Sequence, residues 1–187
     1  MRVLVGCEES QTVCKAFREC GHEAYSCDIL PTRGNPKWHV NKNILELLNF
    51  TQWDLVILHP PCTALAVSGN RWYGEGMPKN EDRWGAIRWT AKLWCYAKLG
   101  AARVALENPV SVLWPHINYD ELQYIQPWQF GHGETKKTGL ALHNLPPLKP
   151  TNIVEGREHK VWKMPPSKTR ARDRAVTYQG IAEAMAT

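Results

Sequence analysis

The stretch that decides the fold of this 187-residue chain is Trp53-Asp54-Leu55-Val56-Ile57-Leu58-His59-Pro60-Pro61-Cys62. Residues 55–58 form an unbroken, β-prone apolar run, which is typical of a strand buried in a parallel sheet. Pro60 and Pro61 end the run because neither can donate a backbone N–H to a neighbouring strand. Cys62 therefore stands just beyond a buried strand, where open α/β folds bind ligands. We expect Cys62 to be a nucleophile; the alternative is a small buried apolar residue, the usual role of a free cysteine.

The start of the chain has the layout of a nucleotide-binding half-fold. An apolar strand over residues 2–5, a loop with Gly6, a helix and a second strand over residues 23–27 lead to Asp28. Asp28 follows Val5 by 23 residues, close to the spacing of about 20 at which a carboxylate binds ribose hydroxyls. Because the loop lacks a G-x-G-x-x-G pattern, a nucleoside-containing cofactor without a pyrophosphate fits better than a dinucleotide.

The whole chain reads as one α/β domain over residues 1–187. Residues 1–125 supply the core αβ units, and residues 126–187 an irregular, basic part of the same domain. Ser10 is the expected N-cap of the first helix, and Gly21 is expected to end it. The pattern further predicts these elements: a long helix at 80–100, a strand at 103–106, antiparallel strands near 126–130 and 134–138, and a helix at 178–185.

A second polar tip follows the strand at 103–106, where Glu107-Asn108-Pro109 comes directly after the apolar run. If this strand lies beside the strand at 55–58, a thiol and a carboxyl group face one pocket. Nearby cations or a helix N-terminus would lower the pKa of the Cys62 thiol. In a dry pocket the Glu107 carboxyl group can stay protonated and donate a proton or a hydrogen bond.

These groups suit methylation of a pyrimidine ring at C5, a carbon that is not nucleophilic by itself. Addition of the Cys62 thiolate at C6, with Glu107 holding N3 and the exocyclic amine, converts the ring into an enamine. C5 can then attack an electrophilic methyl group, and Asp28 would hold the ribose of the cofactor that carries it.

With these residues the chain resembles the DNA (cytosine-5-)-methyltransferases, and especially their small phage-type relatives that lack the usual target-recognition domain. In that family a Pro-Cys pair, here Pro61-Cys62, supplies the nucleophile, and a Glu-Asn pair, here Glu107-Asn108, contacts the target cytosine. An acid after the second strand, here Asp28, binds the ribose of S-adenosylmethionine. The resemblance implies a Rossmann-like methyltransferase fold, with a mostly parallel sheet and helices on both faces.

The resemblance assigns the remaining site residues in two groups. The cofactor-binding group is Gly6, Cys7, Glu8, Asp28, Ile29, Asn43, His59 and Pro60. The substrate-binding group is Pro61, Asn108, Arg71, Lys136, Lys137, Arg170 and Arg172. Asn43 stands where the family usually has an acid near the adenine, Pro109 replaces a valine, and Arg170-Ala171-Arg172 is a loose match to an Arg-x-Arg motif.

Charge and composition point to a nucleic-acid partner, with DNA expected first and RNA or a free nucleotide left open. The net charge is +5, and residues 156–174 alone carry seven Lys or Arg against two acids. Such a basic segment suits phosphate contacts, although it can also be a solvated tail. Because duplex cytosine must be flipped out before this chemistry, the polar loop from Thr63 to Lys79, with Arg71, is expected to clamp the base.

The cysteines indicate a reducing compartment. None of the six forms a C-x-x-C pair, so neither a disulfide framework nor a metal site is expected. With no apolar run of membrane-spanning length and no signal peptide, we expect a cytoplasmic protein, of a bacterial host if it is phage-encoded.

Three rival functions remain open at the level of sequence. His59-Pro60-Pro61-Cys62 also resembles an amino-methyltransferase motif, in which an aromatic residue takes the place of Cys62. The weak first loop and Asn43 favour a catalytically inactive nucleic-acid-binding or decoy protein that kept the fold. The third rival is a C5-modifying enzyme that acts on a free nucleotide.

Overall fold

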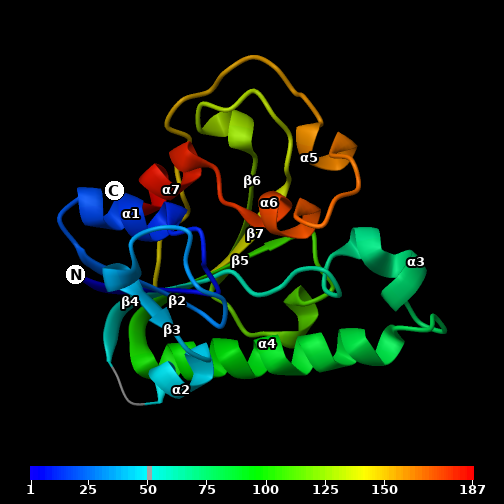
Figure 1. Cartoon of the computed structure of the whole chain (residues 1–187), viewed down its shortest axis with the longest axis horizontal. Helices are drawn as coiled ribbons and strands as arrows, with labels where there is room; N and C mark the ends of the chain where they lie inside the picture. Colours follow the sequence, from blue (N-terminus) through cyan, green and yellow to red (C-terminus); the bar gives the residue numbers. More distant parts are fainter. Residues whose placement is uncertain (50–51) are drawn as a thin grey trace.

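The computed structural model describes residues 1–49 and 52–187 (Figure 1). Seven strands form one sheet, seven α-helices surround it, and four short 3₁₀ turns connect them, within this described part. The strands are β1 (Arg2–Gly6), β2 (Glu23–Asp28), β3 (His39–Asn41), β4 (Trp53–Leu58), β5 (Ala101–Pro109), β6 (Glu121–Ile125) and β7 (Thr138–His143). The helices are α1 (Thr12–Glu19), α2 (Ile44–Leu48), α3 (Asn70–Tyr73), α4 (Asn80–Gly100), α5 (Lys160–Lys163), α6 (Arg170–Ala175) and α7 (Gln179–Ala186).

The sheet has the strand order β3-β2-β1-β4-β5-β7-β6. The first five strands in this order run parallel, and β7 is antiparallel to both of its neighbours. The chain runs outward from β1 to β2 and β3, and then returns to build β4 and β5 on the other side of β1. In open α/β sheets such a reversal opens a crevice at the carboxyl ends of the strands. Here the reversal lies between β1 and β4, the strand that ends at His59-Pro60-Pro61-Cys62.

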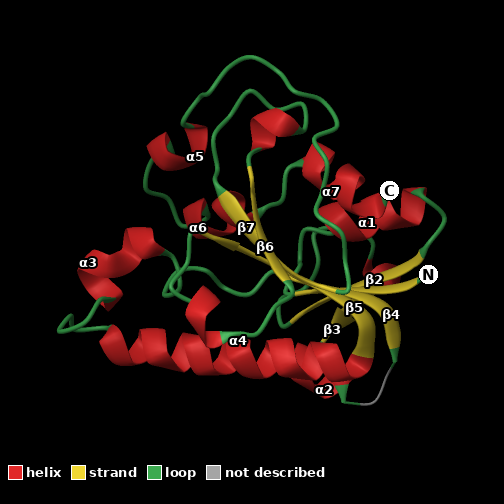
Figure 2. Cartoon of the chain, turned by 180° about the vertical axis from the view of Figure 1, so that it is seen from behind, coloured by secondary structure: helices red, strands yellow, loops and turns green. Residues whose placement is uncertain are grey.

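Helices cover both faces of the sheet, as the sequence predicts. Helices α1 and α7 pack on one face, where Phe17 and Ile181 join the apolar side chains of β1 and β4. Helices α2 and α4 pack on the other face, where Ile44 and Trp94 are buried. Figure 2 shows the same layers from behind, with α4 running along one side of the sheet and α1 and α7 on the opposite side. The expected class, an α/β fold with a mostly parallel sheet, is confirmed.

The longest helix, α4, has 21 residues and begins with Glu81 and Asp82 in its first turn. Acids there interact favourably with the positive end of the helix dipole. The helix buries Leu93 and Trp94 but is otherwise mixed in polarity. Among the described residues, no helix combines the length and the apolar character needed to cross a membrane.

The start of α1 differs from the prediction. Ser10 is not the N-cap; Gln11 occupies that position with a left-handed φ of 62°, and its side chain does not cap the helix. The capping acceptor is Glu8, whose Oε1 accepts a hydrogen bond from Val13 N at 2.6 Å and whose Oε2 accepts one from Cys14 N at 3.2 Å. The predicted end is confirmed, because Gly21 follows the helix with a φ of 82°.

The antiparallel strands predicted near 126–130 and 134–138 are wrong. Pro127 cannot continue the ladder of β6, and residues 127–129 instead form a 3₁₀ turn. Gln129 closes this turn by accepting a hydrogen bond from Gln126 N at 2.7 Å through its Oε1 atom. The antiparallel pair is β6 and β7, so the part of the chain after residue 126 supplies one strand of the sheet and, through α7, part of one face.

Candidate active site at the carboxyl edge of the sheet

The tips of β4 and β5 lie side by side. Leu58 pairs with Leu106 in the parallel ladder, so His59 and Glu107 follow at the same level. His59 Nδ1 lies 2.7 Å from Glu107 Oε2, and Asn108 Nδ2 donates to Pro60 O at 3.2 Å. Two hydrogen bonds therefore join the tip that carries Cys62 to the tip that carries Glu107.

The backbone around Cys62 is held on both sides. His59 N donates to Gly6 O at 2.9 Å, which extends the contact between β4 and β1 by one residue. The carbonyl oxygen of Cys62 accepts hydrogen bonds from Leu65 N at 3.0 Å and from Ala66 N at 2.8 Å. Cys62 thus lies in a turn that begins directly after the two prolines, and its side chain is partly buried.

His59 and Glu107 form a buried ion pair, each with 10% of its side chain exposed. Burial opposes the charged imidazolium, but the hydrogen bond and the charge of Glu107, with the charge of Glu8, raise the pKa of His59. Burial also opposes the carboxylate of Glu107, but His59 and Lys136 outweigh it and lower the pKa of Glu107. The expectation that Glu107 stays protonated is therefore wrong for the free protein, in which Glu107 is an ionised hydrogen-bond acceptor.

The Cys62 thiol has a raised pKa, contrary to expectation. Burial is the largest cause, and the negative charge of Glu107 adds to it. Lys136 and Arg174 act in the opposite direction without compensating. In the free protein Cys62 is therefore a neutral thiol at pH 7. Lys136 and Arg174 favour its thiolate, so a decrease in its burial or a loss of the negative charge on Glu107 would lower its pKa.

Lys136 reaches this edge of the sheet from β7. Thr138 pairs with Pro109 across the antiparallel ladder, so Lys136 extends past the end of β5. Its Nζ donates to Val176 O at 3.3 Å, which ties the segment between α6 and α7 to the same edge.

Two polar atoms at the paired tips are buried without a hydrogen-bond partner in the described part of the chain. They are His59 Nε2 and Asn108 Oδ1. Buried polar groups in proteins almost always have partners, so each such atom calls for an explanation. Both belong to side chains whose other polar atom joins β4 to β5.

The carboxyl end of β2 offers a more open surface. Asp28 Oδ1 accepts a hydrogen bond from Leu30 N at 2.8 Å, and burial raises the pKa of this carboxyl group. Ile29 beside it has 75% of its surface exposed. Asn43 is exposed and caps α2, with its Oδ1 accepting from Leu45 N at 3.1 Å. This side of the crevice thus combines a carboxylate, an amide and an open apolar side chain.

The first loop is turned inward rather than toward a ligand. Gly6 is buried beneath the side chain of Ile44, which occupies the space that a Cβ would need. Cys7 has a left-handed φ of 59°, and its N–H donates to Cys27 O at 2.7 Å. The N–H of Glu8 donates to the same oxygen at 3.3 Å, and its carboxylate caps α1. The loop is no phosphate cradle, in agreement with its lack of a glycine-rich pattern.

The other predicted substrate residues lie on surface segments. Arg71 belongs to α3 and stacks on Trp72, with 5.3 Å from its guanidinium carbon to the ring centroid. Lys137 lies 4.6 Å from the ring centroid of Tyr124 at the sheet edge. Arg170 is turned toward its own segment, since its Nε donates to Met164 O at 2.7 Å. Arg172 is exposed on α6.

Two more residues stand out in the structure: Arg174, which sequence reasoning counted only as part of the basic segment, and Trp162, which it did not name. Arg174 influences the Cys62 thiol, whereas the predicted match was Arg170-Ala171-Arg172; the overlapping Arg172-Asp173-Arg174 has the same Arg-x-Arg spacing and was the available signal. Trp162 on α5 is 76% exposed between Lys160 and Lys163. A tryptophan within a run of lysines was the sequence signal for this surface residue.

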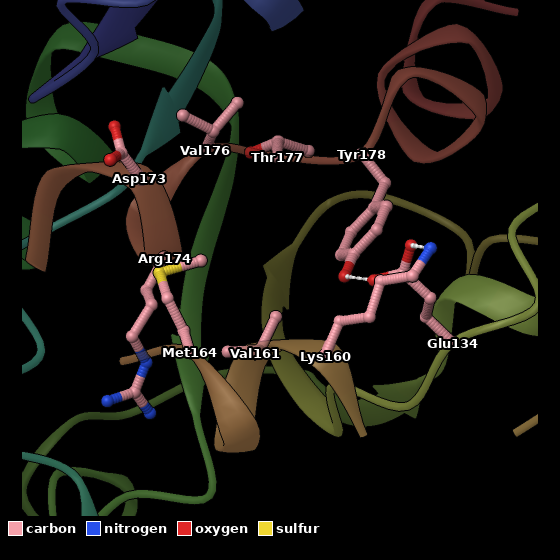
Figure 3. A pocket seen from close by; sticks show the side chains of 9 residues that line it. All are labelled: Glu134, Lys160, Val161, Met164, Asp173, Arg174, Val176, Thr177 and Tyr178. Atoms are coloured by element: carbon pink, nitrogen blue, oxygen red, sulfur yellow. Dashed lines mark hydrogen bonds and ion pairs between the residues drawn. The ribbon is translucent and has the colours of Figure 1, made fainter. Parts of the chain in front are cut away.

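A cavity of about 250 Å³ lies beneath α5 and α6 (Figure 3). On one side, Tyr178 donates its hydroxyl to Glu134 Oε2 at 2.6 Å, and Lys160 Nζ lies 3.0 Å from Glu134 Oε1. In Figure 3 the guanidinium of Arg174 points away from these residues. The Glu134 network thus anchors the basic segment to the body of the protein, while the Arg174 charge is left for other contacts.

No family model and no curated protein sequence matches the chain. Among solved structures, the Dnmt2 methyltransferase of S. pombe is similar, with a TM-score of 0.52 and 15% identity, over 87% of this chain and 54% of that one. An E. coli prophage protein described as a DNA modification methyltransferase matches with a TM-score of 0.48 and 11% identity, over 82% of this chain and 51% of that one. The chain spans about half the length of these proteins. With its strand order, the Dnmt2 likeness establishes a Rossmann-like methyltransferase fold.

Proposed function

We propose that this protein is an S-adenosylmethionine-dependent methyltransferase that methylates C5 of cytosine in nucleic acid through a covalent Cys62 adduct. The observation that carries the proposal is the pairing of the Cys62 tip of β4 with the Glu107 tip of β5, next to the reversal point between β1 and β4. The nucleophile follows β4 and the buried carboxylate lies near the end of β5. These strands are neighbours in the sheet, although the end of β4 at Leu58 and the start of β5 at Ala101 are 43 positions apart in the sequence.

The proposed chemistry follows from the positions of these two side chains. As Cys62 Sγ bonds to C6 of cytosine, the thiol proton passes to N3 of the ring, and Glu107 accepts a hydrogen bond from the exocyclic amine. C5 then bonds to the methyl group that bound S-adenosylmethionine would supply, with S-adenosylhomocysteine as the leaving group. Loss of the C5 proton to water and breakage of the Sγ–C6 bond, with return of the N3 proton to sulfur, restore the aromatic ring and the thiol.

The carboxyl end of β2 suits the adenosine part of that cofactor. Asp28 would bind the ribose hydroxyls, Ile29 would cover one face of the adenine, and Asn43 would contact its edge. Ile29 is exposed and therefore accessible to the adenine in this assignment. His59 and Pro60 border the same crevice, whereas Gly6, Cys7 and Glu8 would shape it through their backbone and packing.

The basic C-terminal segment and α3 are the proposed nucleic-acid contacts. Arg172 and the Lys137 side chain would bind phosphates, and Trp72 and Trp162 offer exposed rings, 53% and 76% exposed, on which unpaired bases can stack. The S. pombe and E. coli proteins carry methyltransferase names, and the E. coli name specifies DNA. We therefore place DNA first among the substrates.

A covalent-trapping assay tests the proposal. An oligonucleotide that contains 5-fluorocytosine, incubated with the protein and S-adenosylmethionine, should give an adduct on a denaturing gel, because fluorine at C5 blocks the final proton loss. The Cys62→Ser variant should give none, and Cys95→Ser, at an exposed cysteine on α4, should behave like the wild type. Absence of an adduct with single-stranded and duplex DNA and RNA would overturn the proposal.

Two observations favour a second candidate, a catalytically inactive nucleic-acid-binding protein. The Cys62 pKa is raised, and the first loop directs its N–H groups at Cys27 rather than at a ligand. Calorimetry with S-adenosylmethionine separates the candidates, since an inactive protein with a decayed site should not bind it. For an active protein, Asp28→Ala should weaken binding about ten- to a hundredfold, the value of a hydrogen bond to a charged group. Asp54→Ala, at the opposite edge of the sheet, should leave it unchanged.

A further inference from the structure

Four charged side chains alternate in sign along the carboxyl edge of the sheet. Glu8 follows β1, His59 follows β4, Glu107 lies in β5, and Lys136 precedes β7. The charges of Glu8, Glu107 and Lys136 all act on His59. His59 thus contacts Glu107 directly and is influenced by the charges of two further segments that are distant in sequence.

His59 is committed to Glu107 by geometry. Its Nδ1 is 2.7 Å from Glu107 Oε2, both side chains are 90% buried, and the His59 backbone is held by Gly6. The imidazole Nε2 is buried without a partner in the described part of the chain. A neutral alternative, a packed apolar residue at position 59, would leave the Glu107 charge buried and unpaired, at a high cost.

We propose that His59 is the positioning residue of this site, which holds Glu107 as a fixed acceptor so that the site selects pyrimidines bearing an amine at C4. This inference rests on the proposed function, because it takes Glu107 to contact the target base. It goes further by naming the residue that sets the base preference.

The selectivity follows from the hydrogen-bonding capacity of the partners. With one oxygen engaged by His59, an ionised Glu107 can only accept at its other oxygen. We assign this single free oxygen to the group at C4 of the base and not to N3. The exocyclic amine of cytosine donates there, whereas the C4 carbonyl of uracil or thymine also accepts and would leave two acceptors facing each other in a buried site. Sites built on such buried hydrogen bonds reject mismatched analogues by about 10⁴-fold. A protonated and freely rotating Glu107 could donate to the carbonyl and would lose that discrimination.

The preference for an amine at C4 is measured by the rates of adduct formation with two oligonucleotides. One carries 5-fluorocytosine and the other 5-fluorouracil at the target position. The wild type should trap 5-fluorocytosine at least about a hundredfold faster. His59→Leu should reduce that ratio at least tenfold, and His59→Asn, whose amide can replace the Nδ1–H donor, should recover part of it. The matched control is His143→Asn, because the His143–Asp120 pair lies at the opposite edge of the sheet and should not affect the ratio.

The outcomes separate this inference from the proposed function. Absence of any wild-type adduct removes both. A wild-type adduct with a base preference that persists in a folded His59→Leu protein, checked by circular dichroism, overturns the His59 role alone. Histidine ¹⁵N NMR adds a reading that needs no activity: the His59 titration midpoint should fall in Glu107→Gln, and an unchanged midpoint would show that the pair does not set its charge.

Discussion

At the scale of single residues, the site depends on side chains that a low-dielectric environment forces into pairs. Both groups of the His59–Glu107 pair are charged despite burial, because each charged group stabilises the opposite charge of its partner and so offsets the cost of burying it. Cys62 has no such partner among the described residues, and burial leaves it protonated. The carboxylate is therefore ready as an acceptor, while the nucleophile requires activation.

The pH dependence of stability should report this pair. Because the Glu107 pKa is lowered from 4.5, its contribution is present above pH 4.5 and is lost as the pH falls through the lower folded value. Because the His59 pKa is raised from 6.5, its contribution is present below pH 6.5 and is lost as the pH rises through the higher folded value. The free energy of unfolding from urea titrations should therefore fall above pH 6.5.

The isosteric double variant His59→Asn/Glu107→Gln is the control for this measurement. It retains a donor and an acceptor without charges, so its decline above neutral pH should be shallower. The raised pKa of Glu8 also removes stability as the pH rises, and the charge of His59 lowers that pKa, so both proteins are compared in a Glu8→Gln background, where the difference between them reports the pair. Equal slopes would contradict the assignment of a charged pair.

At the scale of elements, the loops between strands and helices hold the site in place. The turn after Cys62 is closed by hydrogen bonds from Leu65 N and Ala66 N to Cys62 O, and the loop after β1 is tied to β2 through Cys27 O, so backbone hydrogen bonds hold both segments. In the loop after β1, the carboxylate of Glu8 accepts hydrogen bonds from the N–H groups of Val13 and Cys14. These groups lie in the first turn of α1, where N–H groups have no acceptor within the helix.

Removal of this cap should destabilise the protein measurably. Glu8→Ala should lower the free energy of unfolding by about 1–2 kcal/mol, the usual value of an N-terminal capping side chain. Ser10→Ala should cost less than Glu8→Ala, because the Ser10 hydroxyl makes only long hydrogen bonds, such as those of 3.4 Å to Glu8 Oε1 and from Thr12 N, whereas Glu8 accepts from Val13 N at 2.6 Å. Chemical denaturation of the two variants shows which residue caps the helix, and a larger loss of unfolding free energy for Ser10→Ala than for Glu8→Ala would contradict the structure.

At the scale of the whole molecule, positive charge gathers in the segment that follows the sheet. Residues 156–174 carry it, Glu134 and Tyr178 anchor it, and Arg174 brings it to the edge of the proposed active site. This segment therefore forms a local basic surface of the molecule.

Nucleic-acid binding should depend on both charge and stacking in this segment. Arg172→Ala should reduce the slope of log K against log salt by about one, the value of one phosphate contact. Trp162→Ala should weaken single-strand binding by about 1–3 kcal/mol through lost stacking and leave that slope unchanged. Fluorescence anisotropy over a salt series measures both, with Lys92→Ala, exposed on α4, as the control expected to match the wild type.

The sequence alone determined the local chemistry of the chain. Apolar runs with period and length typical of buried strands identified β1, β2, β4 and β5, because burial on both faces restricts composition at every position. Prolines, glycines and acids at the ends of those runs located Cys62, Glu107 and Asp28 at strand tips. The likeness of these tips to a methyltransferase pattern led to the expected fold, which the strand order bears out.

Only the tertiary structure decided which groups meet and in what state of charge. The pairing of His59 with Glu107 and the influence of the Arg174 charge on Cys62 join segments with no local sequence signal for one another. The capping of α1 by Glu8 is local, but the sequence pattern did not distinguish Glu8 from Ser10 as the acceptor. The antiparallel pair of β6 and β7 was misplaced because the strands are short and Pro127 follows β6 at once. Protonation depends on burial and on neighbours brought from elsewhere in the chain, so the ionised Glu107 and the neutral Cys62 could be read only from the folded molecule.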